Sequence, residues 1–68
     1  MIFEIGKYYQ HTTGIELSII GELETTLWGK TLIAETNSSD FEAVGSDIYA
    51  TTNYVEISKE EWMKNFSK

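Results

Sequence analysis

Few side chains in this 68-residue sequence have the chemistry that catalysis requires. His11 is the only histidine and cysteine is absent, so a nucleophile would have one candidate base and no thiolate. The neighbours Gln10 and Thr12 offer His11 no partner for proton transfer, and we expect His11 at or near the surface of a hairpin. The Gly-x-Ser-x-Gly turn that presents a catalytic serine is also missing. The sequence therefore predicts no catalytic residue, and a protein that is not an enzyme.

Oxygen ligands gather in one stretch, where Asp40, Glu42 and Asp47 follow Asn37. A calcium-binding EF-hand loop needs alternating acids, a central glycine and a glutamate at its twelfth position, and this stretch lacks that pattern. Gly-x-Gly is absent throughout, which argues against a phosphate loop and a dinucleotide fingerprint. We expect a solvated turn here, with no metal site and no cofactor.

Aromatic residues are the more informative group, because nine aromatic side chains are many for so small a core. Trp28 comes just before Gly29 in an expected loop. Its side chain either stays exposed or folds back to plug an open end of the small β-barrel that the strand pattern predicts below. Tyr8 and Tyr9 are neighbours on an expected strand, so one of them must face outward. Exposed tryptophan and tyrosine beside lysine are typical of protein interfaces. The candidate protein-contact residues are Tyr8, Tyr9, Ile20, Trp28, Lys30 and Tyr49.

The charge of the chain is strongly negative, at −6, with five lysines and no arginine. A nucleic-acid-binding domain normally carries a basic patch, so we expect no nucleic-acid partner. An acidic surface usually keeps a protein soluble, whereas rows of acids can also mimic the phosphates of DNA toward a basic enzyme. The acids considered for such mimicry are Glu16, Glu22, Glu35, Glu42 and Glu56.

The length of the chain fits one domain, residues 1–68. No basic, apolar leader and no run of about 20 apolar residues is present, so we expect a cytoplasmic protein with no membrane partner. So small a core without disulfides has modest stability, and a homo-oligomer is an open alternative to a monomer.

Hydrophobic periodicity indicates which elements position these residues. Apolar and polar residues alternate through Ile15–Glu24, as expected for a long antiparallel strand with one buried face. Ile20 breaks this alternation on the exposed face, and Gly21 falls on the buried face, where it could bend the strand. Ile2–Thr12 is rich in β-branched and aromatic residues and predicts a first strand, which Gly14 connects to the second by a tight turn.

Further strands are expected at Thr31–Glu35, Phe41–Gly45 and Tyr54–Ile57, and one helical turn at about 48–50. A C-terminal helix is expected at about 59–67. Ser58 and Glu61 have the spacing of a capping box, and Trp62 with Phe66 would form an apolar stripe that docks on the sheet. The predicted fold class is mostly β: a five-stranded antiparallel meander that curls into a small SH3-like barrel or half-barrel, with a short C-terminal helix.

Three stretches together resemble small proteins encoded by phages and prophages of Gram-positive bacteria. They are residues 6–14 (Gly-Lys-Tyr-Tyr-Gln-His-Thr-Thr-Gly), residues 25–35 (Thr-Thr-Leu-Trp-Gly-Lys-Thr-Leu-Ile-Ala-Glu), and residues 56–58 with Glu61 and Trp62. That group is of unknown function, so the resemblance implies a setting, the bacterial host cell, and neither an activity nor a site. A shorter similarity, of residues 53–56 to the last strand of SH3 domains, lacks the rest of that family's pattern and implies no binding of proline-rich peptides.

Three hypotheses for function follow. The first is a phage- or prophage-type accessory protein that acts by binding another protein, and also itself. The second is an acidic inhibitor that mimics nucleic acid toward a host or phage enzyme. The third is a carbohydrate- or small-ligand-binding module in which Trp28 is the stacking platform.

Overall fold

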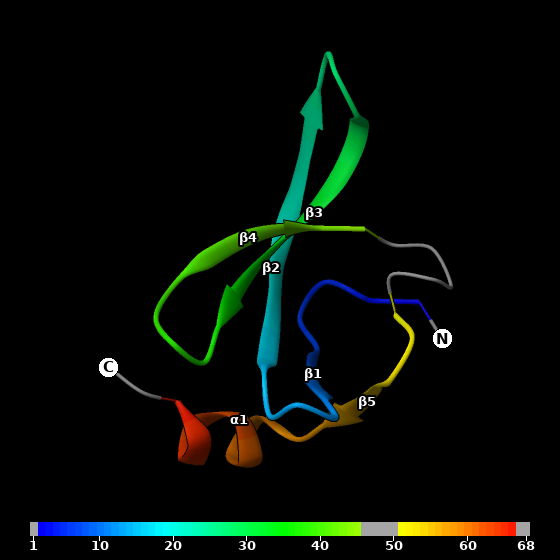
Figure 1. Cartoon of the computed structure of the whole chain (residues 1–68). Coiled ribbons are helices and arrows are strands. Elements are labelled where there is room, and N and C mark those ends of the chain that lie inside the picture. The colour runs from blue at the N-terminus through cyan, green and yellow to red at the C-terminus, as the bar shows by residue number, and fades with distance from the viewer. Residues whose placement is uncertain (1, 46–50, 67–68) are drawn as a thin grey trace.

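The computed structural model describes residues 2–45 and 51–66, and within them the chain forms one open β-sheet and a helix (Figure 1). The strands are β1 (Tyr8–His11), β2 (Glu16–Thr25), β3 (Gly29–Thr36), β4 (Phe41–Val44) and β5 (Tyr54–Ile57), and the helix is α1 (Lys59–Asn65). Each neighbouring pair is antiparallel, in the order β4-β3-β2-β1-β5. The predicted mostly β fold, a half-barrel with a C-terminal helix, is confirmed. One detail differs, because β5 pairs with β1 instead of continuing the meander beside β4.

The first hairpin forms as the sequence predicts, although its first strand is shorter. Gly14 has a φ of +96°, and the His11 N–H donates to the Ile15 carbonyl oxygen at 2.7 Å, which closes the turn. Gly6 also has a positive φ, of +90°, in a turn that precedes β1. The residues before this turn therefore lie outside the sheet, and β1 begins only at Tyr8.

The core lies on one face of the curved sheet. Its buried members are Phe3, Tyr9, Leu17, Ile19, Leu32 and Ala34, with Val44 and Tyr54 packed against them. Phe3 comes from the segment before β1, and its ring lies 4.8 Å from that of Tyr9 and 5.1 Å from that of Tyr54, between centroids. This aromatic contact gives the N-terminal segment a fixed place without strand pairing.

Helix α1 docks on the sheet, as the sequence predicts, and the structure places it on the face opposite the core at β1. Trp62 is buried, and its ring stacks on that of Tyr8 at a centroid distance of 5.8 Å. The Glu61 N–H donates to the Ser58 side-chain oxygen at 3.1 Å, which caps the first turn of the helix.

A β-bulge in the middle of β2 changes which residues face the core. The pairing with β3 shifts between Ile19 and Gly21, so that Ile20 is the extra residue. Beyond it, Gly21 pairs with Ile33 and faces outward, and Leu23 is exposed. The alternation of β2 predicts Gly21 and Leu23 on the buried face, and this is wrong because the inserted residue reverses the faces of the strand.

Candidate protein-binding surface

The far end of the β2–β3 hairpin extends away from the rest of the molecule (Figure 1). At its tip, Leu27 is 78% exposed and Trp28 is 69% exposed. The Trp28 N–H donates to the Thr25 hydroxyl oxygen at 2.9 Å, and Gly29 adopts a φ of +67° that completes the turn. Two large apolar side chains are therefore presented to solvent on a backbone held by its own hydrogen bonds. We call these two residues the hairpin tip.

The structure places three of the six predicted contact residues along this hairpin. Trp28 does not plug the barrel end, so that alternative is wrong. Ile20 at the bulge is half exposed. Lys30 is exposed one residue past the turn, and its Nζ lies 3.9 Å from Glu22 Oε1 on the facing strand.

The other predicted contact residues do not join this surface. Tyr9 is only 1% exposed, so it cannot contact a partner, because its ring belongs to the core and its hydroxyl oxygen accepts the Glu4 N–H at 2.9 Å. Tyr8 is half-buried beneath Trp62. Tyr49 and the helical turn predicted beside it lie outside the described residues.

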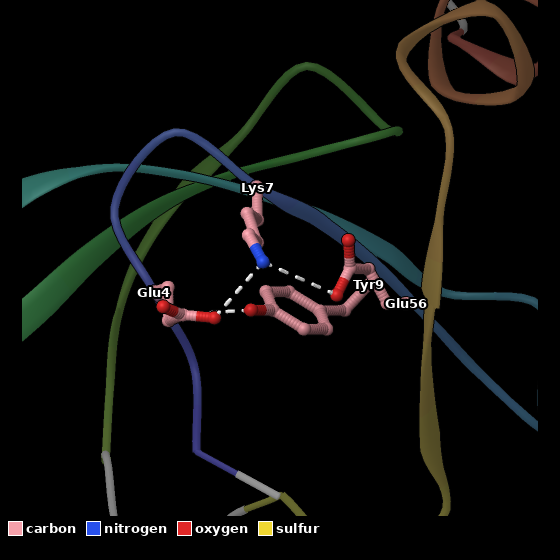
Figure 2. A network of polar contacts seen from close by, with 4 residues as sticks. All are labelled: Glu4, Lys7, Tyr9 and Glu56. Atoms are coloured by element: carbon pink, nitrogen blue, oxygen red, sulfur yellow. Dashed lines mark hydrogen bonds and ion pairs between the residues drawn. The ribbon is translucent and has the colours of Figure 1, made fainter.

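A polar network joins the N-terminal segment to β5 on the exposed surface. Figure 2 shows Lys7 between Glu4 and Glu56, with Tyr9 beside them. The Lys7 ammonium lies 3.0 Å from a Glu4 carboxylate oxygen and 3.6 Å from one of Glu56. The hydrogen bond that the Lys7 ammonium donates to the Glu4 carboxylate, followed by the charges of Glu4 and Glu56, raises the pKa of Lys7 above its ordinary value of 10.5. The network thus neutralises part of the acidic surface.

Glu16 is a buried polar residue that the sequence-based analysis assigned to the solvent-facing side of β2. It is 1% exposed because α1 covers that side of the strand. Its Oε2 accepts hydrogen bonds from the Asn65 amide at 2.6 Å and from the Gln10 amide at 3.1 Å. Its Oε1 is buried with no hydrogen-bond partner among the described residues. Glu16 thereby ties helix α1 to the sheet.

An apolar area lies on the outer face of the sheet, the face opposite the core, beyond the part that α1 covers. Cross-strand partners share a face, so the pairs Gly21 with Ile33 and Ile33 with Ala43 place this row opposite the core. Phe41 lies on the same face and is 67% exposed. We call this area the outer patch, and its apolar side chains are Leu23, Ile33, Phe41 and Ala43. Sequence reasoning missed Leu23 and Phe41, because the strand pattern assigned Leu23 to the core.

Among the residues considered for catalysis and metal binding, His11 and Asn37 hold turns by hydrogen bonds. Glu42 lies in β4, and Asp47 lies outside the described residues. The His11 ring nitrogen Nδ1 lies 2.9 Å from the Thr13 hydroxyl oxygen. The Asn37 side chain accepts the Glu16 N–H and donates to the Gly14 carbonyl oxygen. Within residues 2–45 and 51–66, no three histidine or carboxylate side chains are grouped closely enough to hold a metal ion, and no pocket is found. No helix in this described part has the length and apolar character needed to cross a membrane.

Comparisons with protein-family models, curated proteins and solved structures find no match to this chain. The resemblance to phage and prophage proteins therefore stays a prediction.

Proposed function

We propose that this chain is a non-catalytic accessory protein of phage type that binds another protein by inserting its hairpin tip into an apolar pocket. The observation that supports this proposal is the exposure of Leu27 and Trp28 on a projecting, internally bonded hairpin. Tryptophan is enriched among the residues that dominate binding energy at interfaces. A turn that is already ordered loses little conformational entropy when it binds, which favours affinity.

The alternative of nucleic-acid mimicry has less support from the arrangement of the acids. Glu16 is buried and is hydrogen-bonded to Asn65 and Gln10, so it cannot represent a phosphate. Glu22 and Glu56 lie beside lysines, which reduces their net negative field. Glycan binding through Trp28 alone stays an alternative that the experiment below distinguishes.

The experiment uses the two tryptophans, which differ in environment. Trp62 is buried, and Trp62→Phe leaves Trp28 as the single tryptophan, which can be excited selectively over the tyrosines. With this variant, lysate of phage-infected Gram-positive cells is fractionated on immobilised chain, and each purified retained protein is titrated against it. We expect a blue shift of Trp28 emission on binding, because the indole leaves water.

The control variants distinguish specific binding through the hairpin tip from non-specific adsorption through any exposed apolar side chain. Trp28→Ala and Leu27→Ser should each abolish retention, while Val55→Ser, a change at another exposed apolar residue, on β5, should leave retention unchanged. Retention that survives both tip substitutions would contradict the proposal. A shift of Trp28 emission by a panel of glycans, with no protein retained, would favour the carbohydrate alternative instead.

A further inference from the structure

Strand β4 lies at an edge of the sheet, since among the described residues no strand pairs with its outer side in the order β4-β3-β2-β1-β5. An open edge presents backbone donors and acceptors to which another strand can pair. The hydrogen bond from the Thr36 N–H to the Asp40 carbonyl oxygen, at 2.7 Å, shows which residues of β4 bond to β3 and which point their backbone groups outward. Bonded and non-bonded pairs alternate along an antiparallel ladder, so the pairs of Glu35 with Phe41 and Ile33 with Ala43 are non-bonded. The N–H and C=O groups of Phe41 and Ala43 therefore point away from β3.

The side chains along this edge divide into an apolar face and an acidic face. Phe41 and Ala43 belong to the outer patch and are both exposed. Asp40 and Glu42 alternate with them and are exposed on the other face. The ion pairs found among the described residues involve neither Asp40 nor Glu42. Within the part of the chain that the structure describes, these two carboxylates, two residues apart, form no ion pair with a lysine.

We propose that the β4 edge binds an extended segment of another protein, in which apolar residues alternate with lysine or arginine, by strand addition. The backbone of the segment would pair with Phe41 and Ala43. Its apolar side chains would extend the outer patch, and its basic side chains would face Asp40 and Glu42, since residues two apart share a face of a strand. Charge complementarity selects this occupant among extended segments.

The same charges disfavour a second copy of the chain as the occupant. Two antiparallel β4 strands would bring Asp40 and Glu42 of one copy beside the same acids of the other, and like charges directly opposite destabilise a sheet. The net charge of −6 on each copy adds to this repulsion. This inference is also independent of the hairpin tip, because Trp28 takes no part in it.

The probe for this site is a blocked heptapeptide of alternating lysine and valine, and the control is the same peptide with glutamate in place of lysine. Titration into the isotopically labelled chain is followed by amide resonances and by hydrogen exchange. We expect the lysine peptide to shift the resonances of β4 and to slow exchange at the Phe41 and Ala43 amides at least tenfold. The glutamate peptide should leave both unchanged.

Ala43→Pro is the matched variant, because it removes an outward N–H and keeps the ladder to β3 intact. We expect it to weaken lysine-peptide binding at least tenfold, and Trp28→Ala to leave that binding unchanged. Should Ala43→Pro fail to fold, the same peptide methylated on alternate backbone nitrogens, tested with the wild-type chain, should lose its binding.

Three outcomes would overturn the proposal. They are equal binding of the glutamate peptide, resonance shifts confined to other strands, and self-association of the free chain through β4. If Trp28→Ala and Leu27→Ser retain the lysate partner, the hairpin-tip proposal is contradicted. The β4 proposal then still holds, since peptide binding at β4 does not use the tip.

Discussion

Trp28 and Trp62 show how position in the fold decides what one residue type does. Trp62 is 4% exposed and holds α1 on the sheet through Tyr8, whereas Trp28 is presented to solvent at the hairpin tip. The sequence indicates the first role through the helical spacing of Trp62 and Phe66 after a capping serine. It leaves the second open, since a tryptophan before a glycine turn can point either way.

Substitution of each tryptophan by alanine should therefore change the stability by very different amounts. Trp62→Ala should lower the free energy of unfolding by about 3–5 kcal/mol, the usual cost of removing a large buried aromatic side chain. A domain of this length has about 3–10 kcal/mol in total, so the variant will be marginally folded. Trp28→Ala should change stability by less than about 0.5 kcal/mol, because most of this side chain is exposed to solvent. Urea denaturation followed by circular dichroism measures both, and equal losses would contradict the assignment.

Asn65 tests whether Glu16 is the attachment point of α1. Asn65→Ala removes the donor that lies 2.6 Å from Glu16 Oε2, and a hydrogen bond to a charged group contributes about 1.5–3 kcal/mol. Asn65→Asp should destabilise more at neutral pH, because it places a second carboxylate against a buried one. Urea denaturation gives the ranking wild type, alanine, aspartate in falling stability. An aspartate variant as stable as the alanine variant would show that Glu16 does not hold the helix.

At the scale of elements, β2 shows where sequence periodicity succeeds and where it fails. The period of two correctly predicts a long strand and correctly places Leu17 and Ile19 in the core. It fails at Glu16, because helix α1 buries the face that alternation assigns to solvent. It fails again after Ile20, because one extra residue reverses the faces. Gly21 signals a bend at this point, but the residue types do not say that a residue is inserted into the pairing. Tertiary cover and register are properties of two elements together, so one strand's pattern cannot contain them.

Deletion of Ile20 should remove the bulge and preserve the pairing on both sides of it. Without the extra residue, Ile19 opposite Ala34 and Gly21 opposite Ile33 become consecutive pairs of a regular ladder. We expect the variant to fold with the same partners and a straighter hairpin, since bulges bend and twist a strand. Long-range nuclear Overhauser contacts between β2 and β3 measure this. A shift of the pairing beyond Gly21 by one residue would contradict it.

The deletion of Ile20 also tests whether partner binding depends on the direction of the hairpin tip as well as on its two side chains. Leu27 and Trp28 keep their exposure in the deletion variant, while the tip points elsewhere relative to the body. Partner retention should therefore weaken if the partner contacts both the tip and the outer patch, and should persist if it contacts the tip alone. The retention assay described above distinguishes these two modes.

For the whole molecule, the fold class could be predicted from the sequence, and the candidate binding surface only in part. Turn glycines, strand lengths and the capped helix each depend on a few neighbouring residues, and the mostly β half-barrel follows from them. The return of β5 to β1 joins residues almost 50 positions apart, as in the pair Tyr8 with Ile57. Leu27 and Phe41 escaped prediction because exposure of an apolar residue depends on what the rest of the chain leaves uncovered.

Stability should fall at alkaline pH because of two titrating groups. One is Lys7, which follows the N-terminal segment, and the other is Tyr54 in β5. Burial, with a smaller effect of the Glu42 charge, raises the pKa of Tyr54 above its ordinary value of 10.0, and the Glu4 contact raises the pKa of Lys7 above 10.5. The folded state then holds protons that the unfolded state releases, so the free energy of unfolding falls as pH rises. The stabilisation is complete below about pH 10 and is lost as pH rises through the two raised pKa values.

Urea denaturation at intervals from pH 8 to pH 12 measures this fall, and tyrosinate absorbance follows Tyr54 directly. Tyr54→Phe keeps the ring beside Phe3 and removes the ionising hydroxyl, and Lys7→Met removes the ammonium. Each variant should therefore lose stability less steeply above pH 10 than the wild type. Added salt should flatten the Lys7 contribution more than that of Tyr54, since screening weakens exposed charge pairs and leaves burial unchanged. Parallel curves for the wild type and both variants would place the alkaline transition elsewhere in the molecule.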